Sequence, residues 1–337
     1  MNRPPIWRDV PRRNVMLLAV CQALFVSVQT MGAATAPLAA HQMLGVDKSL
    51  ATLPQFIMQV GIMAATIPAS LLMARIGRRG GFTVGALAGL IGGGIAAAAV
   101  FQQNFILLCI GTFFIGIAAA YAWYFRFAAA DAAEPNYRAR AISLVMAGGV
   151  FAGFLGPQTA KWAVDMFSPV QFAGVFVMMA VFAVLTMAIV QALAIPKLTA
   201  AEKAEGGRPL SEIARQPAYI AAIISSMFGY GVMTLVMTAT PLAMLACGFG
   251  FGDSATVIQF HAIAMFLPSF FTGHLIQRFG VLTIIATGAV IEVGCAIVNL
   301  MGIDYWNFMI ANILVGLGWN FTYIGGTTLL TTTYRPA

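Results

Sequence analysis

A few ionisable and amide side chains inside long apolar segments are the residues of this sequence best suited to chemistry. Arg126 lies in the apolar segment 104–130, close after Trp123. A guanidinium there offers paired, planar donors that match a carboxylate or a carbonyl-bearing ligand. The same arginine could instead extend its head group to the nearby aqueous face and bind nothing. We therefore take Trp123 and Arg126 as candidates for a ligand cavity.

Other polar residues recur at helical spacing, which places each set on one helix face. Gln158, Lys161 and Asp165 form one stripe, in which Lys161 and Asp165 lie one turn apart and could form an ion pair. The stripe could equally face external water. The remaining cavity candidates, each of which could instead hold neighbouring helices together, are Gln22, Gln29, Gln55, Gln59, Tyr230, Thr234, Asn312, Trp319, Asn320 and Tyr323.

Three carboxylates are candidates for carrying a proton, because a carboxylate in an apolar segment is costly to keep ionised. Glu292 lies in the middle of an apolar segment, Asp131 near the end of another, and Asp165 in the stripe just described. The histidines and cysteines are scattered and have no metal-ligand spacing. Phosphate-binding loops and nucleophile motifs do not occur either, so the sequence predicts no metal, no cofactor and no enzymatic activity.

The composition identifies the elements that must position these residues. Hydrophobic residues make up 60% of the chain and charged residues 9%, with a mean hydropathy of +0.88, whereas a soluble domain has about 25% charged residues. A helix needs about 20 apolar residues to cross a bilayer, and lipid offers backbone groups no other partners. The sequence therefore predicts an all-α membrane protein with spans at 15–40, 50–74, 81–101, 104–130, 139–165, 170–195, 218–246, 254–276, 281–301 and 305–331.

The basic residues predict the orientation of the spans. Of the 18 basic residues, 15 fall on the side of the N-terminus, and Lys48 alone falls on the opposite side. Cytoplasmic loops carry such an excess, so the N-terminus is predicted to be cytoplasmic. This placement also accounts for the net charge of +7 without a nucleic-acid partner.

One long polar stretch divides the chain. It covers 196–217 and predicts a cytoplasmic linker between a six-helix bundle, 1–195, and an incomplete bundle of four helices, 218–337.

The two halves repeat a short motif after their second span. Arg75-Ile-Gly77-Arg78-Arg79 follows one span, and Arg278-Phe-Gly280 follows the corresponding span of the second half, as expected for parallel repeats. The first motif resembles the signature between helices two and three of the major facilitator superfamily, Gly-x-x-x-Asp-Arg-x-Gly-Arg-Arg. The Gly and Asp positions of that signature are Ser70 and Ala74 here, so Asp131 or Glu134 could replace the missing acid as a partner of the arginines.

Two further motifs occur in the family's order. Arg138-Ala-Arg140-Ala141 resembles the family's entry to the fifth helix, and Gly149-x-x-x-Gly153-x-x-Gly156-Pro157 partly matches the antiporter motif within it. In the family the motif between helices two and three lines the cytoplasmic gate. The resemblance therefore implies a gate role for the residues of both Arg-x-Gly motifs, which are Arg75, Gly77, Arg78, Arg79, Arg278 and Gly280.

The resemblance implies a secondary transporter of the bacterial inner membrane. Such a protein moves a small organic solute by alternating access, with a coupling proton and as a monomer. A sensor without transport activity, or a degraded transporter, is the alternative. The family has two bundles of six helices, whereas the spans found here number six plus four. We therefore expect a fragment or a truncated chain that lacks its last two helices. A genuine ten-helix protein is the alternative.

Overall fold

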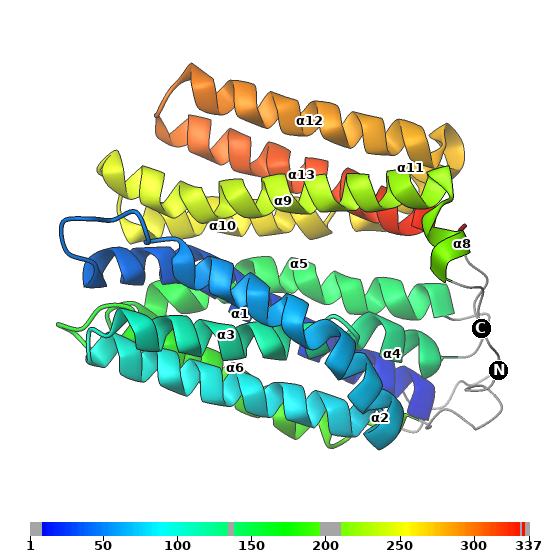
Figure 1. Cartoon of the computed structure of the whole chain (residues 1–337), viewed down its shortest axis with the longest axis horizontal. Coiled ribbons are helices and arrows are strands. Elements are labelled where there is room, and N and C mark those ends of the chain that lie inside the picture. Colours follow the sequence, from blue (N-terminus) through cyan, green and yellow to red (C-terminus); the bar gives the residue numbers. More distant parts are fainter. Residues whose placement is uncertain (1–8, 134–137, 196–209, 331, 334–337) are drawn as a thin grey trace. The chain divides into compact units, whose positions relative to one another are not determined.

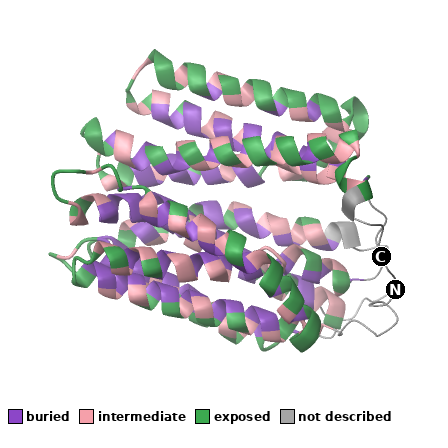
Figure 2. Ribbon diagram, viewed as in Figure 1, coloured by how far each residue is buried: buried purple, intermediate pink, exposed green. Residues whose placement is uncertain are grey.

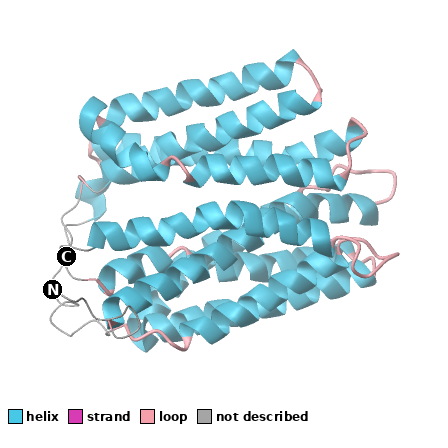
Figure 3. Ribbon diagram, turned by 180° about the vertical axis from the view of Figure 1, so that it is seen from behind, coloured by secondary structure: helices cyan, strands magenta, loops and turns pink. Residues whose placement is uncertain are grey.

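The computed structural model describes residues 9–133, 138–195, 210–330 and 332–333. Helices and the loops between them make up these residues, and no strand occurs within them (Figure 3). The chain forms two compact units. Unit 1 comprises Met1–Lys197 with Gly250–Gln259, and unit 2 comprises Leu198–Phe249 with Phe260–Ala337.

Unit 1 contains the first six helices of Figure 1. They are α1 (Val10–Met43), α2 (Leu53–Phe101), α3 (Phe105–Ala122), α4 (Phe125–Asp131), α5 (Arg138–Ala163) and α6 (Ala173–Val190). Asp9 caps α1 by accepting a hydrogen bond from the backbone of Arg12 at 3.3 Å. Within the unit, α2 packs along α3 and α6, while α1 packs along α5 and α6.

Unit 2 contains the later helices. They are α8 (Leu210–Ala214), α9 (Pro217–Ala246), α10 (Phe251–Phe266), α11 (Ser269–Phe279), α12 (Val281–Met301) and α13 (Tyr305–Leu330), with the first part of α10 belonging to unit 1. Helix α13 lies at the centre of this unit and packs against both α9 and α12. The long helix α13 is largely buried, whereas α12 shows mostly exposed residues (Figure 2).

The predicted spans agree with these helices in number and approximate position. Among the described residues, eight helices are long and apolar enough to cross a membrane, or nine when α10 and α11 are taken as one bent span. The 49-residue α2 covers the predicted span 81–101 and all but the first three residues of the span 50–74, which accounts for the tenth. Two predicted spans are interrupted, since 104–130 is divided into α3 and α4, and 254–276 into α10 and α11.

The repeated motif gives both units the same backbone turn. Gly77 in α2 has φ 89° and ψ 164°, and Gly280 between α11 and α12 has φ 87° and ψ 148°. Residues other than glycine rarely adopt this backbone conformation. The two Arg-x-Gly motifs therefore end one span and start the next in the same way, which supports the internal repeat.

Small residues set the helix spacing in unit 1. A Cβ atom on Gly93 of α2 would lie 2.8 Å from the backbone nitrogen of Ala180 in α6, and one on Gly111 of α3 would lie 2.7 Å from the backbone nitrogen of Ala96 in α2. Such close approach is typical of membrane helices, which associate through packing contacts and have no water to expel.

Candidate substrate site

The interruption between α3 and α4 positions Arg126. The helical path pauses at Trp123 and Tyr124, and α4 resumes at Phe125. The phenol of Tyr124 donates a hydrogen bond of 3.0 Å to the backbone oxygen of Thr66 in α2, so a neighbouring helix braces the interruption. Both residues of the turn keep right-handed helical backbone angles, and Phe105–Asp131 remains one stretch long enough to span a membrane.

Aromatic rings surround the guanidinium of Arg126. Its Cζ lies 4.9 Å from the ring centroid of Phe127 and 5.8 Å from that of Trp123. Contacts of this kind are worth about 0.5–2 kcal/mol. These cation–π contacts stabilise the charge and leave the in-plane N–H groups of the guanidinium free to donate hydrogen bonds to a ligand.

The polar edge of Arg126 is not satisfied within the described chain. Its Nε is buried and has no hydrogen-bond partner there, and neither of the ion pairs that the structure describes involves this residue. A buried donor left without an acceptor costs about 1–3 kcal/mol. A ligand carbonyl or carboxylate between the rings would remove this cost.

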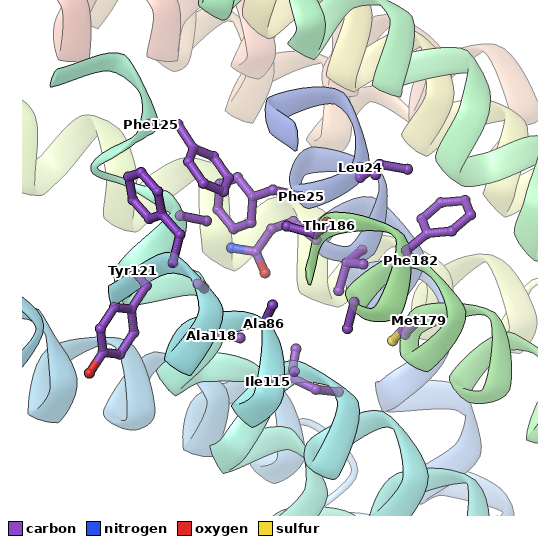
Figure 4. Close-up of a pocket in the computed structure, with 18 residues that line it drawn as sticks. Leu24, Phe25, Ala86, Ile115, Ala118, Tyr121, Phe125, Met179, Phe182 and Thr186 are labelled. Atoms are coloured by element: carbon purple, nitrogen blue, oxygen red, sulfur yellow. The ribbon is translucent and has the colours of Figure 1, made fainter. Parts of the chain in front are cut away.

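Phe25 of α1 extends the aromatic surface. Its ring meets Trp123 edge to face, with centroids 6.1 Å apart. Phe25 also lines a cavity of about 60 Å³ inside unit 1, whose other lining residues come from α1, α2, α3, α4 and α6 (Figure 4). Gln29 is one of the few polar residues in the cavity wall, and its Oε1 is buried without a partner among the described residues. Sequence reasoning identified Gln29 but not Phe25 or Phe127, because an aromatic residue in an apolar span carries no distinguishing signal.

Three further glutamine candidates of unit 1 lie on α1 and α2. Gln22 on α1 and Gln55 on α2 are buried, with 7% and 6% of their surface exposed, and Gln59 is half-buried. The Oε1 of Gln55 also has no partner within the described residues. The structure therefore places an unsatisfied amide oxygen on α2 as well as on α1.

The predicted Lys161–Asp165 ion pair is not formed. The ammonium of Lys161 donates to the hydroxyl of Thr256 at 2.7 Å, and Asp165 accepts from Gln171 at 3.1 Å. Gln158 donates to Gln259 at 2.7 Å. The stripe on α5 thus meets polar residues of α10, which offer Lys161 and Gln158 nearer partners than their own helix does.

Unit 2 has an aromatic cluster of its own. Trp319 and Tyr323 of α13 stack in parallel with centroids 4.9 Å apart, and Tyr230 of α9 lies 6.1 Å from Tyr323. Phe266 of α10 meets Trp319 edge to face at 5.9 Å. The structure brings these predicted cavity residues together, with half-buried Thr234 one turn further along α9.

The two asparagines of α13 are interior tethers in the structure. Asn312 donates to Thr240 at 3.0 Å and to Phe308, and its backbone oxygen bonds to His261. Asn320 makes three side-chain hydrogen bonds around the junction of α10 and α11. Both residues are fully buried, so their amides hold helices together in this conformation.

The arginines of the first Arg-x-Gly motif bind neighbouring helices of unit 1. Arg78 forms an ion pair with Asp131 through two bonds of 2.8 and 3.0 Å, as the missing acid at Ala74 led us to expect. Arg79 donates twice to Gln191 at the end of α6, a residue that the sequence did not indicate. Glu134, the other proposed partner, lies outside the described residues.

The remaining motif residues and carboxylates are distributed over both units. Arg75 is exposed, and Arg278 lies over the ring of Phe279 at 5.2 Å. Glu292 on α12 accepts a hydrogen bond of 3.2 Å from Thr322 on α13. Of the three proton-carrier candidates, Asp131 is thus paired with an arginine, Asp165 with an amide and Glu292 with a hydroxyl.

Comparison with known proteins establishes the class. The sequence profile of the Major Facilitator Superfamily matches residues 16–337, and the chain belongs to this family of membrane transporters. It is 41% identical over 334 residues to the riboflavin transporter RfnT of Brucella anthropi, covering 97% of this chain and 82% of that protein. It is 27% identical to the uncharacterized MFS-type transporter YdeG of Bacillus subtilis, covering 98% of this chain and 80% of the relative.

Solved structures show the same fold. The outward conformation of the transporter FucP aligns with a TM-score of 0.61 at 16% identity, covering 95% of this chain and 88% of FucP. A bacterial homologue of the lysosomal transporter Spinster, inward-facing and occupied, aligns with a TM-score of 0.63 at 17% identity, covering 98% and 78%. The protein is therefore an integral membrane transporter of a small solute.

Proposed function

We propose that this transporter carries a flat heteroaromatic solute of the riboflavin class by alternating access. The observation that carries the proposal is the partnerless Nε of Arg126, held between the rings of Trp123 and Phe127. The 41% identity to a riboflavin transporter supports the same substrate class.

The geometry suits the chemistry of a flavin. Riboflavin joins a flat ring system to a neutral polyhydroxyl chain, and the polar edge of its rings carries carbonyl oxygens. The rings of Phe25, Trp123 and Phe127 provide surfaces for stacking, and Arg126 provides in-plane donors for the carbonyls. Stacking and hydrogen bonding would then act on the same part of the ligand, and Gln29 could bind further polar atoms.

The proposal includes a coupling proton and a defined orientation. Glu292 is the best-placed carrier, because its carboxylate is half-buried in the middle of α12 with a neutral hydrogen-bond partner, whereas Asp131 is neutralised by Arg78 and Asp165 is exposed. The excess of basic residues on one side supports a cytoplasmic N-terminus in a bacterial plasma membrane. We take the working unit to be a monomer and its role to be transport without chemical change of the solute.

Flux through proteoliposomes tests the proposal. Purified protein should mediate saturable riboflavin uptake, and an imposed pH gradient should change its rate. Lumichrome, which retains the flat rings but lacks the ribityl chain, should compete, whereas ribitol should not. Competition by ribitol alone would place recognition on the chain and contradict the aromatic site. Absence of saturable riboflavin flux would exclude this substrate, and flux that ignores the pH gradient would exclude proton coupling.

A further inference from the structure

The amide of Gln29 is the second polar group that the described chain leaves unpaired at the aromatic site. Its Oε1 is buried without a hydrogen-bond partner among the described residues, as is the Nε of Arg126. Gln29 also lines the cavity of about 60 Å³ inside unit 1. Because buried polar groups in proteins are nearly always hydrogen-bonded, this oxygen marks a place where a donor is missing.

The described residues of the cavity wall supply no donor for this oxygen. Most lining side chains are apolar, among them Leu24 and Ile115, and Figure 4 shows the hydroxyl of Tyr121 pointing away from the other labelled residues. Thr186 also lines the cavity, but it makes no hydrogen bond with the Oε1 of Gln29. Water can occupy a polar cavity of this size, and a ligand that brings a donor of its own would displace it. The missing donor can therefore come from a ligand.

A chain of aromatic contacts connects Gln29 with Arg126. Gln29 follows Phe25 by one helical turn, so both side chains are on the same face of α1. The ring of Phe25 lies 6.1 Å from that of Trp123, and the Trp123 ring lies 5.8 Å from the Cζ of Arg126. The same aromatic surface thus has an unpaired acceptor on α1 and an unpaired donor on α4, and a flat ligand stacked on the rings can bond to both.

One arrangement of ligand atoms satisfies both protein groups. The guanidinium of Arg126 can only donate, so it requires an acceptor, whereas the amide oxygen of Gln29 requires an N–H or O–H. A cyclic imide presents an N–H between two carbonyl oxygens, all in the plane of the ring. Riboflavin carries such an imide at the polar edge of its rings, and its remaining donors are the hydroxyls of the ribityl chain. The imide edge therefore complements the pair of side chains without leaving the stacking plane.

We propose that Gln29 is a specificity-determining residue that selects ligands with an unsubstituted cyclic imide. Its Oε1 accepts a hydrogen bond from the imide N–H, while Arg126 donates to a flanking carbonyl and the ligand rings stack on Phe25 and Trp123. This inference rests on the proposed function and deepens it, because it names the edge of the flavin that the site recognises. An alkyl group on the imide nitrogen removes the donor and adds bulk, so alkylated flavins are discriminated against.

Flavin binding to the purified full chain, followed by fluorescence quenching, tests this inference with riboflavin and 3-methylriboflavin, which is methylated at the imide nitrogen. The unchanged protein should bind the methylated flavin at least about tenfold more weakly, because one hydrogen bond is lost and its acceptor stays buried. Gln29→Ala should weaken riboflavin binding about two- to tenfold and reduce the difference between the two flavins to about twofold or less. Gln29→Glu keeps an acceptor on a side chain of the same length and should retain the preference. Gln42→Ala is the matched control, since Gln42 lies on the same helix, bonds to Gln171 at 3.0 Å and does not line the cavity.

Lumiflavin, which has a methyl group in place of the ribityl chain, separates the imide from the hydroxyls. Gln29→Ala should weaken lumiflavin and riboflavin binding by the same factor. A loss seen with riboflavin alone would place the amide on the ribityl chain and overturn the inference. Equal binding of riboflavin and 3-methylriboflavin to the unchanged protein would also overturn it, and this comparison decides even if Gln29→Ala does not fold. Absence of any riboflavin binding would instead contradict the proposed function itself, so the two failures are distinguishable.

Discussion

Two membrane helices of this transporter are interrupted, one in each unit, and their interruptions are stabilised in different ways. In unit 2, α10 ends at Phe266 and α11 begins at Ser269 with a bend of 43°. Pro268 explains the bend, because it lacks a backbone N–H and its ring clashes with the preceding turn. In unit 1, α3 gives way to α4 around Trp123 and Tyr124 without any proline.

The interruption in unit 2 satisfies its own polar groups. The amide of Asn320 donates to the backbone oxygen of Met265 at 2.6 Å and to the hydroxyl of Ser269 at 2.8 Å, and it accepts from Thr272 at 2.6 Å. Both amide hydrogens and the amide oxygen of Asn320 thus bond to groups beside the bend. Such an arrangement fixes a shape and leaves little for a ligand.

The interruption in unit 1 leaves a donor available. Tyr124 braces it through one hydrogen bond to α2, while the buried Nε of Arg126 has no acceptor within the described residues. The comparison separates the two interruptions by whether the polar side chain at each one is already satisfied, as Asn320 is and the Nε of Arg126 is not. The predictions below test that distinction.

The largest expected effect is on ligand binding and follows from Arg126→Ala. Riboflavin affinity should fall about 10- to 100-fold, because a hydrogen bond to a charged group contributes about 1.5–3 kcal/mol. Quenching of flavin fluorescence measures the affinity. Arg126→Lys is the control, since it keeps the charge but loses the planar donors, and it should recover only part of the affinity. The thermal midpoint should change little, and a large decrease would mean that Arg126 is structural.

Asn320→Leu should act on stability and not on affinity. Three hydrogen bonds are lost, and at about 0.6 kcal/mol for each bond inside a membrane the free energy of unfolding should fall by about 2 kcal/mol. Thermal unfolding in detergent measures the change. Ser269→Ala, which removes a single one of these bonds, should cost about a third as much. A weakened affinity in correctly folded Asn320→Leu protein would instead place this amide in the substrate path.

The sequence predicted much of the fold, because the bilayer restricts the possibilities so strongly. Span 281–301 was placed at the observed bounds of α12, and 305–331 within one residue of α13. The Arg-x-Gly motifs indicated the repeat, and the backbone of Gly77 and Gly280 supports it. The interruption near Pro268 could have been expected from the proline, but the one near Trp123 could not, since no helix-breaking residue marks it.

The candidate site was less predictable. Arg126 and Trp123 were found because ionisable and large amphipathic residues are rare in spans. Phe25 was missed because its role depends on the packing of α1 against α3 and α4, a tertiary contact that a single sequence does not encode locally. The partner of Lys161 was not predictable for the same reason, since Thr256 lies 95 positions away along the chain.

Phe127→Leu should have a smaller effect on binding than Arg126→Ala. The ring of Phe127 is the nearer of the two to the guanidinium, at 4.9 Å, but it is 46% exposed. A contact of this kind at an exposed site contributes about 0.5–1 kcal/mol, so riboflavin affinity should fall about two- to fivefold. Phe127→Tyr keeps an aromatic face and serves as the control. If both variants bind equally well, the ring orients the guanidinium no better than an aliphatic side chain does.

The smallest effect should come from Tyr124→Phe. This variant removes the hydrogen bond that braces the unit 1 interruption and leaves the rings of Trp123 and Phe127 in place. The hydroxyl donates a single bond of 3.0 Å to Thr66, so the expected loss of stability is about 0.6 kcal/mol. Parallel measurement of thermal unfolding and riboflavin affinity shows what the brace does. A small loss of stability with unchanged affinity would mean that Tyr124 only supports the helix. An affinity loss larger than the stability loss would show that the phenol holds Arg126 in its binding position, and the interruption itself would then be part of the site.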